Sequence, residues 1–254
     1  MEKSDIFKET LIQPSTKAWS WDELRKKKIE ECNEKLVLMS LAPDKILVSS
    51  QYYIQDISGA LSESYARESV YQKLVEAIKF LPAGYRLVVL DCWRPLKVQR
   101  SLFNKLKDKL KKVYPSVSDE EVTNKTLIYV ALPSKDATKP SPHNTGGAVD
   151  LTIVDENGLL LNMGTNFDDS TLKARTTYYE EQLGNGIKLN PKELEALKNR
   201  RLLFHIMTSV GFTNYLDEWW HYDYGNQNWS WMSGSEHAIY GKIAPLFPWN
   251  KEIE

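Results

Sequence analysis

The chain has 254 residues, of which 42% are hydrophobic and 26% are charged. This length suffices for one domain with a full core, and the composition excludes disordered and fibrous proteins. Lys plus Arg (33) and Asp plus Glu (34) nearly cancel to a net charge of -1, which excludes the strong basic field that non-specific nucleic-acid binding needs.

The first half of the chain predicts three helices and a strand. Residues 16–36 are charged and Trp-containing, which is typical of a short solvated helix. Apolar residues at helical spacing predict a helix over 64–81, which ends at Pro82. The run 86–93 predicts a strand whose polar end begins at Asp91, and Pro95 begins a following helix with its lysines on the solvated face.

The second half predicts three strands and a long helix. Residues 127–133 and 148–155 are expected strands, and the Asn157-Gly158 turn after the second predicts a hairpin, so the sheet is antiparallel there. A capping box at Asn190 and a stop at Gly211 predict a helix over 190–210. Residues 218–224 read as a strand, and the tail to Glu254 is expected to wrap the surface.

His143 and Asp150 flank the entry into the predicted strand 148–155. The Pro- and Gly-rich loop between them can fold back and bring both side chains to one point. Alternation places Asp150 on the less apolar face of that strand. A loop histidine and an aspartate are, on their own, more often structural than a metal-binding pair.

The segment Asp217-Glu218-Trp219-Trp220-His221 favours the metal-binding interpretation over the structural one, because it adds a second imidazole and a second carboxylate. Glu218 and His221 are three residues apart and would lie on opposite faces of a strand, so Glu218 must sit in the bend before it to serve the same site. Catalytic zinc favours three protein ligands and an open position, which His143, Asp150 and His221 supply. Glu218 is then free to act as general base.

Arg94 follows the strand 86–93, at a position where side chains commonly enter a site. It is either a salt-bridged surface residue or, beside a metal, a cation that stabilises the tetrahedral oxyanion of peptide hydrolysis.

Four motifs together resemble the D-alanyl-D-alanine dipeptidases: DCWRP at 91–95, SPHNTGGAVDLT at 141–152, MGTNFD at 163–168 and EWWH at 218–221. The resemblance covers about Leu87 to Trp229. It implies one zinc ion per chain on His143, Asp150 and His221, with Glu218 as base and Arg94 as oxyanion stabiliser. It also places Asp168 near the substrate amine, and Ser141 and Asp91 in the same pocket.

The resemblance weakens before residue 60, so Tyr52 and Tyr53 are both candidates for an aromatic substrate contact. It implies an α+β fold, similar to the zinc DD-peptidases and the Hedgehog domain, in which a small antiparallel sheet carries the zinc and helices flank it. We expect a single domain over 1–254, with 1–60 less defined and a C-terminal tail over 230–254 packed on it. His205 and His237 lie outside the motifs and are expected to be structural.

The predicted function is hydrolysis of D-Ala-D-Ala or a similar free dipeptide. The alternatives are a DD- or LD-carboxypeptidase or endopeptidase of peptidoglycan stem peptides, and a zinc-binding module without catalysis. Glu218 and Arg94 argue against the last, because a purely structural site needs neither group.

No apolar run reaches membrane-spanning length, and residues 1–15 lack the apolar stretch of a secretory leader. We therefore expect a cytoplasmic protein without nucleic-acid or membrane partners, or a periplasmic one if a leader was removed before Met1. Cys32 and Cys92 are expected to be reduced and largely buried thiols. The sequence predicts no oligomeric state.

Overall fold

The computed structural model describes residues 2–13, 17–127, 130, 133–134 and 136–246. In this part of the chain a mixed five-stranded sheet has the order β2-β4-β5-β7-β6, and a separate two-stranded sheet pairs β1 with β3. The strands are β1 Leu36–Leu38, β2 Ile46–Val48, β3 Tyr65–Arg67, β4 Arg86–Asp91, β5 Ala148–Val154, β6 Thr213–Asn214 and β7 His221–Asp223.

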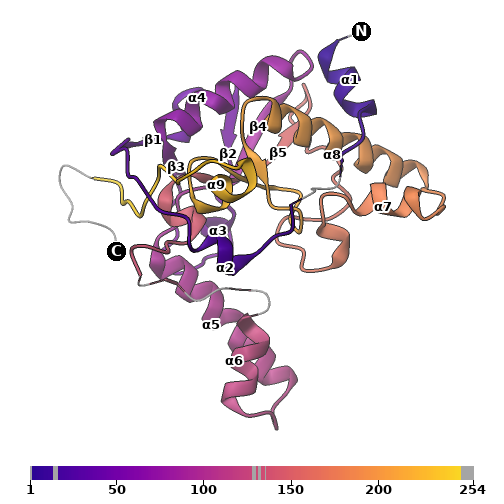
Figure 1. The fold of residues 1–254 in the computed structure, drawn as a ribbon. Coiled ribbons are helices and arrows are strands. Elements are labelled where there is room, and N and C mark those ends of the chain that lie inside the picture. Colours follow the sequence, from indigo (N-terminus) through magenta and orange to yellow (C-terminus); the bar gives the residue numbers. More distant parts are fainter. Residues whose placement is uncertain (1, 14–16, 128–129, 131–132, 135, 247–254) are drawn as a thin grey trace.

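Helices flank the sheet, which confirms the predicted α+β class (Figure 1). The α-helices are α1 Lys3–Glu9, α2 Trp21–Leu24, α3 Gln51–Ile54, α4 Glu68–Ala77, α5 Leu96–Val113, α6 Asp119–Leu127, α7 Tyr178–Gly184, α8 Pro191–Ser209 and α9 Gln227–Ser233. Short 3-10 turns are η1 Met39–Leu41, η2 Ile78–Phe80, η3 Pro142–Thr145 and η4 Leu172–Ala174. Helices α5 and α6 pack on each other and extend away from the sheet (Figure 1).

The sheet is antiparallel except at one edge. Strands β4, β5, β7 and β6 pair antiparallel, whereas β2 pairs parallel with β4. The hairpin predicted after β5 is limited to one antiparallel bridge between Val154 and Leu160. All of β5 is buried, so the central strand lies between packed layers. Its apolar side chains join a core that includes Val149, Leu151 and Ile153 of β5 and Leu202, Leu203 and Ile206 of α8.

The helix predicted over 64–81 begins later than its periodicity suggested. Tyr65–Arg67 forms β3, which pairs antiparallel with β1, and the α-helix starts at Glu68. Helix α8 agrees with its prediction, because Asn190 and Glu193 form the capping box that the sequence indicated. The strand expected over 127–133 falls mainly outside the described residues, and Leu127 itself ends helix α6.

Helix α8 also anchors the loop that carries the MGTNFD motif. Arg200 is buried and donates from its guanidinium to the carbonyls of Met163, Lys173 and Arg175, at 2.7 to 2.9 Å. Asn199 donates to the Asn162 carbonyl at 2.9 Å. One turn of α8 therefore fixes the backbone of two neighbouring loops.

Part of the chain beyond α9 packs against the domain, whereas Leu246 is exposed. Ala238 and Tyr240 are fully buried, and the Tyr240 hydroxyl donates to Glu34 at 2.6 Å. Residues 247–254 of the predicted tail lie outside the described residues. Cys92 is buried as expected, whereas Cys32 is exposed, and both are free thiols. Among the described helices, none is both long and apolar enough to cross a bilayer.

Candidate metal centre

Three neighbouring strands bring polar residues into one row across the sheet. Asp91 ends β4 and is the Cα partner of Asp150 on β5, which is in turn the partner of His221 on β7. Directly opposed residues on antiparallel strands project their side chains to the same face. The register therefore gathers Asp91, Asp150 and His221 at one end of the sheet.

His143 reaches the same point from the turn that precedes β5. Its carbonyl accepts from the backbone N–H groups of Arg94, at 3.2 Å, and Gly146, at 3.3 Å, so the turn is tied to the segment after β4. Gly146 has φ +69°, and a Cβ there would lie 2.4 Å from a methyl carbon of Leu36. Glycine is therefore required where the chain reverses into β5.

The side chains of His143, Asp150 and His221 converge. One potential ligand atom from each lies within 4.8 Å of the other two, and all three residues are buried. His143 Nε2 is 3.4 Å from Asp150 Oδ2, and His221 Nδ1 is 2.9 Å from Asp150 Oδ1. Two imidazoles and one carboxylate are a donor set that suits zinc and leaves a position open.

Burial and neighbouring charges shift the pKa of each of the three residues. Burial, with Arg94 and His221 nearby, holds the pKa of His143 well below its usual value, so its imidazole is neutral and can ligate. Burial lowers the pKa of His221, but Asp223 and Asp150 outweigh this and raise it. Burial raises the pKa of Asp150 to about 6, opposed by the hydrogen bond with His221. A metal cation among these groups would offset the desolvation of the carboxylate.

Glu218 lies in the turn before β7. This is the position expected of a residue that precedes His221 by three and serves the same site. Its Oε2 is 3.9 Å from His221 Nδ1, and its side chain is 39% exposed, so the carboxylate is near the ligand atoms and remains open to solvent. Asn214 fixes this bend by donating to the carbonyls of His221 and Glu218, at 2.9 and 3.3 Å. Burial raises the pKa of Glu218 to about 7, with Asp150 and Asp168 adding to the rise and His221 opposing it.

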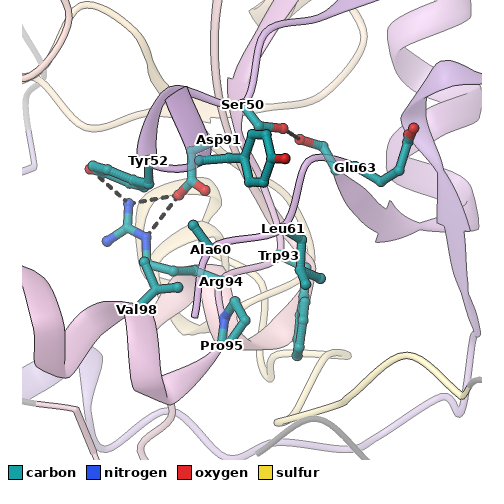
Figure 2. A pocket seen from close by; sticks show the side chains of 12 residues that line it. Ser50, Tyr52, Ala60, Leu61, Glu63, Asp91, Trp93, Arg94, Pro95 and Val98 are labelled. Carbon is teal, nitrogen blue, oxygen red and sulfur yellow. Dashed lines mark hydrogen bonds and ion pairs between the residues drawn. The ribbon is translucent and has the colours of Figure 1, made fainter. Parts of the chain in front are cut away.

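Arg94 projects from the segment after β4 and is held on several sides (Figure 2). It contacts Asp91 Oδ2 through Nε at 2.8 Å and through a terminal nitrogen at 2.7 Å, and it donates to Gln99 Oε1 at 2.7 Å. The same terminal nitrogen is 3.7 Å from Asp150 Oδ2. Burial lowers the pKa of Arg94, but Asp91 and its other neighbours outweigh this and raise it, so the guanidinium stays cationic.

Of the two candidate tyrosines, Tyr52 faces the centre. Its ring lies 4.8 Å from the Arg94 guanidinium carbon, and its hydroxyl is 3.2 Å from an Asp168 carboxylate oxygen. Tyr53 is 55% exposed. Asp168 adopts φ +63°, a left-handed conformation that Asp tolerates better than most residues, and burial raises the pKa of its carboxyl. Ser141 immediately precedes η3, two residues before His143.

Two contacts of the site were not predicted from the sequence, that of Gln99 with Arg94 and that of Asp223 with His221. A signal for Asp223 existed, because a residue two positions after His221 on a strand shares its face. The remaining histidines lie in other surroundings. His205 Nε2 is 3.0 Å from the Thr10 carbonyl, and His237 Nε2 is 3.5 Å from Glu30.

Known proteins match this chain over most of its length. Residues 61–238 match the peptidase M15 family, described as D-ala-D-ala dipeptidase. A D-alanyl-D-alanine dipeptidase of Synechocystis sp. is 29% identical over 229 residues, which are 85% of this chain and 92% of the relative. The D-alanyl-D-alanine dipeptidase of Escherichia coli is 32% identical over 141 residues (56% of each chain), and that of Enterococcus faecalis is 34% identical over 145 residues (55% of this chain, 62% of the relative). This chain therefore belongs to the D-Ala-D-Ala dipeptidase family of metallopeptidases.

Proposed function

We propose that this protein hydrolyses D-Ala-D-Ala, or a similar free dipeptide, with one zinc ion held by His143, Asp150 and His221. The observation that carries the proposal is the convergence of three buried ligand atoms within 4.8 Å, beside a carboxylate that is not among them. A purely structural zinc site is closed by its ligands and needs no such carboxylate. We further propose that the chain acts as a single peptidase domain in the cytoplasm.

The residues present fit a catalytic metal rather than a structural one. When bound, zinc polarises the scissile carbonyl and lowers the pKa of the attacking water. The protein holds the ligand atoms in place, through the pairing of β5 with β7 and the turn η3. Its remaining groups act on the substrate and on the protons.

Glu218 is proposed as the proton carrier. Its carboxylate accepts a proton from the attacking water and delivers it to the nitrogen of the leaving amino acid, so that the peptide bond breaks without a free amide anion. A base is most effective when its pKa is close to the working pH, which agrees with a pKa raised to about 7. Partial exposure lets the carboxylate reach both water and substrate.

Arg94 is proposed to stabilise the oxyanion that forms when water attacks the carbonyl. Asp91 and Gln99 hold the guanidinium on two sides, and its terminal nitrogen 3.7 Å from Asp150 lies beside the metal position. A cation fixed in this way needs little reorganisation when negative charge develops on the carbonyl oxygen. Asp91 thus lines the pocket and orients Arg94.

Asp168 is proposed to bind the α-ammonium group of the dipeptide. Asp168 is exposed at the site, and the Tyr52 hydroxyl donates to its carboxylate and orients it. An oriented carboxylate that is open to the pocket can form a charge-assisted hydrogen bond with the ammonium group of a substrate. Ser141, at the start of the η3 turn, is proposed to line the same pocket.

A substrate screen tests the proposal. Zinc-loaded protein is incubated with D-Ala-D-Ala, L-Ala-D-Ala and a peptidoglycan stem pentapeptide, and the released amino acids are quantified. We expect fastest release from D-Ala-D-Ala. Preferential cleavage of the pentapeptide would indicate a carboxypeptidase instead, and failure to cleave any of the three would support a non-catalytic zinc module.

A further inference from the structure

His221 is contacted on both sides of its ring by carboxylates. Nδ1 faces Asp150 Oδ1 at 2.9 Å, whereas Nε2 lies 3.1 Å from Asp223 Oδ2. Asp223 follows His221 by two residues in β7, so both side chains project to the same face of the strand. Its residue exposure is 1%, which places the carboxylate behind the ring and out of reach of solvent.

Two asparagines hold the Asp223 carboxylate. Asn226 Nδ2 donates to Oδ1 at 2.6 Å, and Asn228 Nδ2 donates to Oδ2 at 3.0 Å. Both asparagines are buried. The side-chain oxygen of Asn226 also accepts from the Trp229 N–H at 3.0 Å, as the N-cap of α9. Its amide group therefore cannot rotate by half a turn without losing the cap, and its nitrogen stays directed at Asp223.

This arrangement leaves Asp223 only one role toward the imidazole. The Asp223 oxygens already accept hydrogen bonds from the two asparagine amides, and the carboxylate is placed to accept another from His221 Nε2–H. A proton fixed on Nε2 leaves the Nδ1 lone pair free, and Nδ1 is the nitrogen that faces Asp150.

We propose that Asp223 is a positioning residue of the metal centre, which keeps His221 in the tautomer and ring orientation that ligates through Nδ1 and makes that nitrogen a stronger donor. The inference rests on the proposed metal role of His143, Asp150 and His221. Partners of this kind typically change metal affinity about 10- to 100-fold when removed.

The second imidazole is held differently, which gives the proposal an internal comparison. His143 Nδ1 lies 2.7 Å from the Cys92 carbonyl, a neutral acceptor, so this ring presents Nε2 to the site. Asp91 Oδ2 is also 3.3 Å from His143 Nδ1, but its charge is matched by Arg94 at 2.7 Å. Asp223, by contrast, accepts hydrogen bonds from the neutral side-chain amides of two asparagines. Asp223 thus supplies the less compensated negative charge behind the ligand set, and its effect is specific to His221.

The test compares zinc affinity in wild type, Asp223→Asn, His221→Ala and Leu203→Ala, measured by competition with a chromophoric chelator. Leu203 is a fully buried core residue of α8, so its truncation controls for general loss of stability. Asp223→Asn keeps the size of the side chain but turns one acceptor into a donor. We expect affinity about 10- to 100-fold below wild type for this variant and near wild type for Leu203→Ala.

Cobalt substitution supplies a second readout that a merely structural role would not move. The visible absorption of bound Co²⁺ reports the strength and geometry of its ligands, so the spectrum of Asp223→Asn should shift while that of Leu203→Ala should match wild type. If Asp223→Asn does not fold, Asn228→Ala removes one amide donor from the same carboxylate and is expected to lower zinc affinity in the same direction.

The outcomes separate this inference from the proposed function. Wild type that binds no zinc would overturn the proposed function and, with it, the inference. Zinc binding lost in His221→Ala but unchanged in Asp223→Asn would overturn the inference alone. Equal weakening in Asp223→Asn and Leu203→Ala would also overturn it, because the effect would then belong to the fold.

Discussion

Replacing Glu218 by Gln removes the proposed base while leaving its surroundings in place. The backbone bonds of the turn, Glu218 N–H to the Tyr215 carbonyl at 3.0 Å and His221 N–H to the Glu218 carbonyl at 3.2 Å, do not depend on the side chain. Because the side chain is 39% exposed, an amide there remains solvated. We therefore expect the free energy of unfolding to fall by no more than about 0.5 kcal/mol, because the fold already disfavours the ionised form of Glu218.

The expected effect on catalysis is much larger. General acid and base catalysis contributes about 10²- to 10⁴-fold, which corresponds to about 2.7 to 5.4 kcal/mol of activation free energy. The kcat for D-Ala-D-Ala should fall by that factor in Glu218→Gln, while the zinc content measured by atomic emission stays near one per chain. Activity is followed as release of free D-alanine.

Asp217→Asn is the matched control for this prediction. Asp217 is the adjacent carboxylate, it is 58% exposed, and it pairs with Arg175 at 3.3 Å. The same loss of charge one residue earlier should leave turnover near wild type. Zinc lost together with activity in Glu218→Gln would make Glu218 a ligand, and turnover retained in that variant would refute its role as base.

Three further predictions follow from the contacts of the site and its supports. Arg94→Ala should retain zinc and lose about 10²- to 10³-fold in kcat, as when one oxyanion donor is removed; an effect confined to KM would contradict this role. N-acetyl-D-Ala-D-Ala should be cleaved far more slowly than the free dipeptide, and Asp168→Asn should reduce that discrimination; equal rates for both substrates in wild type would exclude recognition of the ammonium group. Arg200→Met leaves three backbone carbonyls without their donor, so at about 1 to 3 kcal/mol for each group it should lower the free energy of unfolding in urea by at least about 3 kcal/mol. Lys198→Met, on the exposed surface of the same helix, is the control. Equal stability of the two variants would contradict the role of the Arg200 hydrogen bonds in anchoring the two loops.

The parts of the fold that the sequence predicted well are those fixed by local rules. The capping box at Asn190 and the hydrophobic alternation of 148–154 depend on neighbouring residues, and both agree with the structure. The position of Glu218 followed from strand parity, because a residue three before His221 can share its site only from a bend. In these cases, the identity of neighbouring residues and the two-residue period of a strand were sufficient to predict the structure.

Other features depended on contacts between distant segments. Tyr65–Arg67 continues the apolar period of α4 but forms a strand, because Leu36–Leu38 supplies its hydrogen-bonding partner. Tyr52 and Tyr53 are adjacent in sequence, and only the packing of α3 directs the first toward Asp168. The contact of Gln99 with Arg94 likewise depends on where α5 begins relative to β4.

The most direct test of a catalytic zinc centre is a zinc titration of chelator-stripped protein, with D-Ala-D-Ala hydrolysis as the readout. We expect the rate to rise in proportion to added zinc and to saturate at one equivalent per chain, and we expect no such rise in His221→Ala. A rate that is independent of zinc, or an identical titration in His221→Ala, would contradict a catalytic metal centre built on His143, Asp150 and His221.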